Sequence, residues 1–239
     1  MNNRNRGKNT GDDTLFGSEK QISKLKRAVQ DMQYLLTREY PEKAASELAG
    51  NRYRLKTRQL HAVRGASASR LQVDNRKSKE LQISDLKDKT LYLDGFNVVI
   101  LLESMLSGAY IFEGVDGCFR DLSEVHGSYK RVNQTAKAVD LVASFFQKSH
   151  LYKLVWIFDQ PVSNSGRIKQ TVMDFAEEHQ FNWEAELQYN PDKFLAESSE
   201  IVVSSDAWIL DHCKEWFNLA GYLMKEESLS VNLITIVSR

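Results

Sequence analysis

The segment from Leu91 to Ile100, with the sequence LYLDGFNVVI, is the feature that most restricts how this chain can fold. It is an apolar run interrupted by Asp94, with Asn97 three residues later. A continuous apolar run of this kind is typical of a central parallel strand that is covered on both faces. In open α/β sheets, ligands bind beyond the carboxyl ends of the strands, so Asp94 is expected to face a crevice.

Two further predicted strands are also followed by aspartate. The strand expected at 153–158 is followed directly by Asp159, and the strand at 201–203 is followed three residues later by Asp206. Neighbouring strands lie about 4.8 Å apart, so these carboxylates and that of Asp94 converge if the strands are neighbours. Like charges at such distances raise one another's pKa values unless a cation neutralises them. The pattern therefore predicts a site for Mg²⁺ or Mn²⁺, which prefer oxygen ligands.

Three other polar residues are candidates for the same site. Asp192 lies where Pro191 indicates a helix start, a place where the helix dipole alone also favours aspartate. Asp211 follows Asp206 in a predicted helix, and it either points into the site or lies on a polar face. Asn97 either orients a ligand or caps the helix that follows, and the sequence does not separate these roles.

The chain is predicted to consist of a disordered tail over residues 1–17, a helical unit over 18–80 and an α/β unit over 88–239. Apolar residues spaced by three and four predict the helices, whereas alternating strand and helix signals after residue 85 predict a parallel sheet with crossover helices. Helices are expected at 21–40, 44–48 and 52–63, with Gly50 as a C-cap, strands at 90–93, 153–158, 183–187, 201–203 and 231–237, and an inserted β-hairpin near 108–131.

Charge is distributed unevenly although the net charge is zero. Residues 1–80 contain 18 Lys and Arg against 9 Asp and Glu, whereas residues 81–239 contain 14 against 23. A basic unit joined to an acidic one suits binding of a polyanion by the first and of cations by the second, or the two units simply attract each other.

The composition favours a cytoplasmic globular protein. No apolar run reaches the roughly 18 residues that span a bilayer, and the N-terminus lacks the apolar centre of a signal peptide. Cys118 and Cys213 are far apart in sequence and are expected to be buried free thiols.

Basic and hydroxyl residues supply candidates for phosphate or RNA binding. Arg52, Arg54 and Arg58 interleave with aromatic residues in the helical unit and are expected either to contact RNA or to be solvated. After the second strand, a polar loop offers a phosphate site at a helix N-terminus, or is an ordinary turn. The candidates in that loop are Ser163, Ser165 and Arg167.

Four separated motifs together resemble the PIN-like nuclease superfamily, in particular its NYN branch, over residues 88–239. They are DGFN at 94–97, Asp159 after a strand, DKFL at 192–195 and SSD at 204–206. The resemblance implies a five-stranded parallel sheet of order 3-2-1-4-5 and an acidic site that binds Mg²⁺ or Mn²⁺ and hydrolyses RNA. It implies Asp94, Asp192 and Asp206 as metal ligands, with Asp159 completing the acidic pocket and Asn97 supporting it.

The residues AGNRYRL at 49–55 and RQL at 58–60 resemble the helical domain of an uncharacterised family that joins such a unit to a PIN-like domain. The leading hypothesis is a metal-dependent ribonuclease, and the alternative is a non-catalytic RNA-binding or regulatory protein that retains the fold. The insertion near 108–131 is not part of the minimal fold, and its candidate roles are to cover the site, to form a homodimer contact or to hold substrate.

Overall fold

The computed structural model describes residues 6–123 and 127–236. The first residues of the predicted tail, part of the predicted insertion and the end of the last predicted strand lie outside the described residues. The helices are α1 (Asp12–Phe16), α2 (Glu19–Thr37), α3 (Glu42–Arg52), α4 (Thr57–Ala66), α5 (Arg70–Ser78), the 3₁₀ helix η1 (Ile83–Leu86), α6 (Gly95–Leu106), α7 (Thr135–Ser149), α8 (Ser165–Glu178), α9 (Pro191–Ala196), α10 (Ala207–His212) and α11 (Leu219–Glu226). The strands are β1 (Glu80–Leu81), β2 (Thr90–Asp94), β3 (Tyr110–Glu113), β4 (Phe119–Arg120), β5 (Lys153–Asp159), β6 (Trp183–Gln188), β7 (Ile201–Val203), β8 (Trp216–Phe217) and β9 (Asn232–Thr235).

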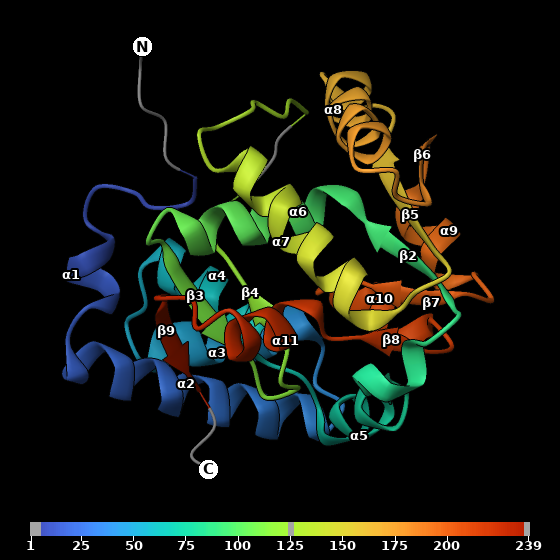
Figure 1. Cartoon of the computed structure of the whole chain (residues 1–239). Helices are drawn as coiled ribbons and strands as arrows, with labels where there is room; N and C mark the ends of the chain where they lie inside the picture. Colours follow the sequence, from blue (N-terminus) through green and yellow to red (C-terminus); the bar gives the residue numbers. More distant parts are fainter. Residues whose placement is uncertain (1–5, 124–126, 237–239) are drawn as a thin grey trace.

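A six-stranded parallel sheet of order β1-β8-β7-β2-β5-β6 forms the centre of the α/β part (Figure 1). The prediction of an α/β chain with a parallel sheet preceded by helices is therefore confirmed. Strand β2 lies between β5 and β7, with Asp94 paired to Ile157 and Leu91 to Ile201. The four strands β6, β5, β2 and β7 adjoin one another in the predicted order, so their carboxyl ends lie along one edge.

The predicted sheet is wrong in strand count and in its fifth strand. Strand β9 does not lie beside β7 in the central sheet. It belongs to a separate three-stranded sheet, in which β3 pairs in parallel with β9 and antiparallel with β4. The positions next to β7 are taken by β8 and then β1, each only two residues long. Strands this short carry no periodic signal in the sequence, and β1 lies before the segment in which strands were expected.

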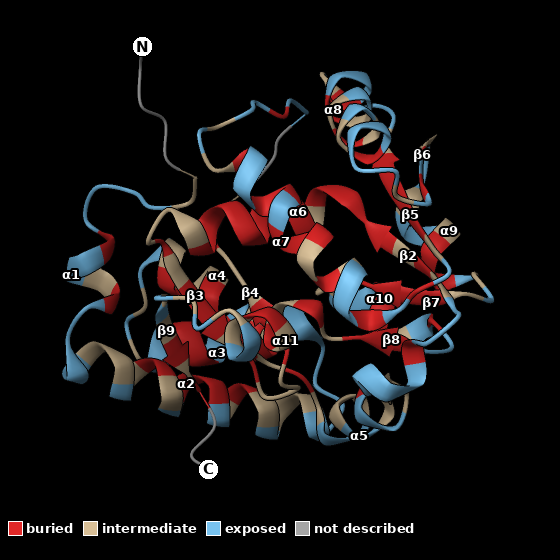
Figure 2. Ribbon diagram, viewed as in Figure 1, coloured by how far each residue is buried: buried red, intermediate tan, exposed pale blue. Residues whose placement is uncertain are grey.

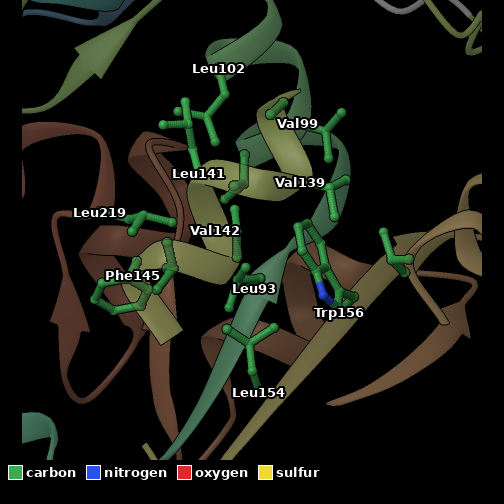
Figure 3. Close-up of a cluster of buried hydrophobic side chains, with 14 of the residues drawn as sticks. Leu93, Val99, Leu102, Val139, Leu141, Val142, Phe145, Leu154, Trp156 and Leu219 are labelled. Carbon is green, nitrogen blue, oxygen red and sulfur yellow. The ribbon is translucent and has the colours of Figure 1, made fainter. Parts of the chain in front are cut away.

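Helices cover both faces of the central sheet, so its central strands β5, β2 and β7 are largely buried on both sides, whereas the edge strands β6 and β1 are partly exposed (Figure 2). On one face, Leu93, Leu154 and Trp156 pack against apolar side chains of α6 and α7 (Figure 3). On the other face, Val155 and Val202 pack with residues of α9 and α10. This two-sided burial explains the continuous apolar runs. No helix within the described ranges is long and apolar enough to cross a bilayer.

The turn from β2 into α6 depends on Gly95. A Cβ atom at this position would lie 2.5 Å from ring carbons of Phe158 and 2.9 Å from the carbonyl oxygen of Ile157. The absent side chain lets the first turn of α6 approach β5 closely. The turn thereby holds Asp94 at the end of a covered strand.

The N-terminal helices pack around a second apolar cluster, whose residues include Val29, Met32 and Val63 and also Phe112 and Ile234 of the smaller sheet. The N-terminal helices and the smaller sheet therefore share one apolar core. The cluster brings residues from both ends of the sequence together.

Gly50 was predicted to end a helix, but it lies inside α3. A Cβ atom there would lie 3.2 Å from Cδ1 of Leu60, so the glycine allows α3 and α4 to pack closely. The helix ends instead near Arg54, whose φ of 47° is left-handed, and the Leu55 amide donates to the carbonyl of Gly50 at 2.9 Å.

The prediction that residues 1–17 form a disordered tail is wrong for the part that the structure describes. Helix α1 lies within it, and Phe16 is fully buried with its ring 5.2 Å from that of Phe112. Asp12 is also buried, and its carboxylate binds the guanidinium of Arg58 through two hydrogen bonds of 2.6 and 3.0 Å. A short polar segment gains this order because distant segments supply the apolar and charged partners, which local sequence does not reveal.

We expect Asp12→Ala to destabilise the protein by about 3 kcal/mol, because it leaves the largely buried Arg58 guanidinium without its carboxylate. The neighbouring Asp13 provides the control, since its side chain is 69% exposed in its pair with Lys8. Asp13→Ala is expected to leave the urea midpoint essentially unchanged. Equal midpoints for the two variants would contradict a fixed place for α1.

Candidate functional site

Asp94 is the last residue of β2 and the N-cap of α6. The hydroxyl of Ser204 donates to its Oδ2 at 2.8 Å, and the backbone amide of Asn97 donates to its Oδ1 at 3.4 Å. Only 9% of Asp94 is exposed. The carboxylate is therefore held between the ends of β2 and β7, at the edge that the sequence predicts.

The loop after β7 is fixed by the residues around it. Asn97 Oδ1 accepts hydrogen bonds from the amide and the hydroxyl of Ser205, each at 2.9 Å. The amide of Asp206 donates to Ser204 Oγ at 3.0 Å, and Asp206 Oδ1 accepts from the amides of Trp208 and Ile209 at the start of α10. The Asn97 side chain thus binds this loop, whereas α6 is capped by Asp94.

Asp192 and Asp159 come from the adjoining elements. Asp192 lies in the first turn of α9, where Asn190 Oδ1 accepts from the amide of Lys193. The ring of Phe194 stacks on that of Tyr92 of β2, with centroids 5.7 Å apart and planes 8° from parallel. This contact holds α9 against the central strand. Asp159 ends β5, the neighbour of β2.

The four aspartates interact electrostatically. Burial raises the pKa of Asp94 to about 7, and the negative charges of Asp192 and Asp206 add to the rise. Partial burial raises the pKa of Asp192, as do the charges of Asp206 and Asp159. Burial also raises the pKa of Asp159. Repulsion between carboxylates thus acts between Asp94 and both Asp192 and Asp206, and between Asp192 and both Asp206 and Asp159. Among the described residues, however, no three acidic, His or Cys side chains are arranged to hold one metal ion together.

Asp211 does not join this site. Its Oδ1 accepts from Nε of Arg76 at 2.6 Å and its Oδ2 from the side-chain Nε2 of Gln72 at 2.8 Å, so it joins α10 to α5. Arg76 is buried and also pairs with Asp116 at 2.5 Å. Neither role that the sequence left open for Asp211 is therefore found. The side chain does not point into the site, and it does not lie on a solvated polar face but binds Arg76 and Gln72.

Arg120 of the hairpin reaches the site and is a residue that the sequence did not single out. Its guanidinium binds both carboxylate oxygens of Asp116 at 2.9 and 2.7 Å, and its Nε donates to the carbonyl of Ser205 at 2.9 Å. The hairpin therefore supports the loop that carries Asp206. Nothing in the local sequence around Arg120 indicates this long-range contact.

The basic candidates of the helical unit have different surroundings. Arg58 is not available to bind RNA, because it pairs with Asp12 and donates to the carbonyls of Gly7 and Leu122. Arg52 is 70% exposed and pairs with Asp31 at 3.1 Å, and Arg54 is exposed.

The three candidates for phosphate binding in the loop after β5 also differ in their surroundings. Ser165 is buried and its hydroxyl donates to the carbonyl of Gln160, so it serves the turn. Ser163 is exposed, and its backbone pairs with Gly127 and Tyr129. Arg167 is exposed and lines a hollow of about 370 Å³. The other cations that line this hollow are Lys130 and Arg131.

A groove of about 540 Å³ adjoins the acidic edge on the side of the helical unit. Asn97, Ser205 and Asp206 line one side of it. His61, Arg64 and Arg120 are among the residues that line the remainder, and a further hollow of about 650 Å³ shares His61 and Arg64 with it. Glu42 and Asp121 also line the groove, Arg64 pairs with Glu42 and Arg120 with Asp116, so the groove brings side chains of both charges to the edge that carries Asp206.

The chain belongs to the family described as "Domain of unknown function (DUF5616)", whose family model matches residues 83–222. Residues 24–79 match a second family model, described as "Protein of unknown function (DUF434)". An uncharacterized protein of Methanocaldococcus jannaschii, MJ0935, is 30% identical over 188 residues, which cover 78% of this chain and 88% of the relative. No solved structure matches this chain.

We expect the Asp94→Asn variant to gain stability relative to the wild type as the pH rises from about 4 to about 7. The folded pKa of Asp94 lies above the ordinary value of 3.8, so over this window the folded protein keeps a proton that the unfolded chain releases. Wild-type stability therefore falls through the window, by up to roughly 4 kcal/mol, and the contribution levels off above about pH 7. Urea unfolding of both proteins in the presence of a chelator measures the difference.

The exposed Asp74 of α5 supplies the matched control, and Asp74→Asn should show no such trend. A stability difference between wild type and Asp94→Asn that stays constant with pH would mean that Asp94 is charged in the folded protein throughout.

Proposed function

We propose that this protein is a metal-dependent ribonuclease that hydrolyses RNA phosphodiester bonds at the carboxyl edge of its central sheet. The observation that carries the proposal is the placement of four aspartates at this edge: Asp94 and Asp159 end neighbouring strands, Asp206 caps α10 after β7, and Asp192 lies in the first turn of α9. The similarity of the motifs around these residues to the PIN-like nuclease superfamily supports the same assignment.

The four side chains are of the chemical type that Mg²⁺ or Mn²⁺ prefers, although no three of them form a ready metal group within the described residues. All four side chains offer oxygen atoms, and no ion pair between residues of the described ranges involves any of them. Mg²⁺ keeps several waters and binds through one or two carboxylates together with substrate phosphates, so it does not need a complete protein cage. When bound, such an ion lowers the pKa of a water molecule and neutralises charge on the phosphate.

The protein's own residues would orient these groups. Ser204 and the Asn97 amide hold the Asp94 carboxylate, while two backbone amides hold Asp206 Oδ1. Fixed carboxylates lose little conformational freedom when a ligand binds.

Exposed cations support RNA as the substrate. Lys130, Arg131 and Arg167 line the hollow after β5, and the exposed Arg64 lines the groove that contains Asp206. Positive side chains along a groove are the usual contacts for a phosphate backbone. Both cysteines, Cys118 and Cys213, are buried free thiols, which suits the cytoplasmic location that we propose.

A non-catalytic RNA-binding or regulatory role is the second candidate. It is favoured by the lack, within the described residues, of a preformed three-ligand metal group. Such a protein would bind RNA without hydrolysing it.

We expect the purified protein with Mn²⁺ or Mg²⁺ to cleave RNA. Asp94→Asn and Asp206→Asn should each lower the rate by at least about a hundredfold, because each removes a carboxylate that would bind the metal or the reacting water. Gel analysis of end-labelled RNA after incubation with each metal measures the rate, and a chelator should abolish it.

Asp74→Asn is the matched control, because this aspartate is exposed on α5 outside the site. It should cleave at the wild-type rate. Cleavage that persists in the Asp94→Asn, Asp206→Asn double variant would exclude this edge as the catalytic site. RNA binding without cleavage under any metal would favour the second candidate.

A further inference from the structure

Two exposed aromatic residues, Tyr189 and Trp208, follow strands that end at the edge of the sheet with the aspartates. Trp208 is 47% exposed, and its backbone amide donates to Asp206 Oδ1 at 2.8 Å. Tyr189 is 77% exposed and follows β6 directly. It precedes Asn190, the cap of the helix that carries Asp192. Both rings therefore belong to the edge of the sheet at which the carboxylates meet.

Trp208 differs from the other tryptophans of the chain. The remaining three are all buried, each with at most 4% exposure. The Trp208 ring packs against the imidazole of His212 one helical turn later, with centroids 4.5 Å apart. Single exposed apolar residues are common on protein surfaces, so exposure alone carries no meaning. The Trp208 ring, however, packs against the ring of His212, and Trp208 lies two residues after Asp206 in the sequence.

The order of the strands sets the separation of the two rings. Tyr189 follows β6 and Trp208 follows the loop after β7, and β5 and β2 lie between these strands. Three strand spacings amount to roughly 14 Å, a distance that a few nucleotides of a single strand can span. The ends of β5 and β2, with Asp159 and Asp94, lie in this interval. A backbone that joined bases at the two rings would pass over the carboxylates.

We propose that Trp208 and Tyr189 are stacking platforms for unpaired bases, so that the site takes single-stranded rather than double-stranded RNA. The proposal rests on the proposed function and adds its substrate class. Bases of a single strand expose their faces and stack on aromatic side chains with little dependence on sequence, whereas bases within a duplex are already stacked. The exposed cations Lys130, Arg131 and Arg167, which line the hollow after β5, have the charge that suits the continuing phosphate backbone.

Fluorescence gives a direct test, because Trp208 is the exposed tryptophan. Oligoadenylate of about twelve nucleotides is titrated into the Asp94→Asn protein, which blocks hydrolysis, and quenching of tryptophan emission is followed. We expect saturable quenching with the single strand and little with a duplex of the same length. An abasic oligomer of the same length and charge should also quench little, since it lacks bases to stack.

Affinity measured by anisotropy of a labelled oligonucleotide tests the side chains. Trp208→Ala and Tyr189→Ala should each weaken binding of the single strand about tenfold and leave binding of the abasic oligomer unchanged. Trp208→Phe should retain most of the affinity, because it keeps a ring. Tyr152→Ala is the matched control: this tyrosine is 63% exposed but precedes β5, at the opposite edge of the sheet.

Several outcomes would overturn the stacking role. The first is equal affinity of the wild type for the abasic and the normal oligomer. The second is an equal loss of affinity for the single strand in Tyr152→Ala and Trp208→Ala. The third is binding that depends on Trp208 for a basic peptide but not for RNA. The result is separable from the proposed function. Cleavage with base-independent binding would remove the stacking and keep the nuclease, whereas base-dependent binding without cleavage would do the reverse.

Discussion

The hydrogen bond from Ser204 to the buried carboxylate of Asp94 is the contact on which the edge of the sheet depends. It joins the ends of β2 and β7, and Ser204 Oγ at the same time accepts from the amide of Asp206. A buried carboxylate without such donors would be costly, because it loses its hydration. Even with them its pKa is raised to about 7, so the ionised form of this carboxylate is unfavourable at the edge.

A second set of contacts joins this edge to the rest of the chain. Asp116 binds Arg76 of α5 and Arg120 of the hairpin, and Arg120 in turn binds the carbonyl of Ser205. Buried ion pairs of this kind add little net stability but fix geometry, since breaking one partner leaves an uncompensated charge. The helical unit and the hairpin thereby help to position the loop before Asp206, and the groove between them opens onto that aspartate.

The parts of the site that could be predicted are those with a local cause. Asp94 and Asp159 follow apolar strands, and the strand ends of a parallel sheet meet at one edge whatever the details of packing. The position of Asp211 could not be predicted, because its partner Arg76 lies 135 residues away in sequence. Arg58 was misjudged for the same reason, since its partner Asp12 lies in a segment whose composition indicates disorder.

The sequence by itself determined the class of the fold, an α/β chain with a parallel sheet preceded by helices. Hydrophobic periodicity is a local pattern, and it specifies the type of each long helix and strand and their order along the chain. It also determined which strands end on aspartate. Only the tertiary structure decided that β8 and β1 complete the sheet and that β9 joins β3. It alone decided that Trp208 is exposed beside the aspartates, while the other tryptophans are buried. These outcomes depend on contacts between distant segments, which no local pattern specifies.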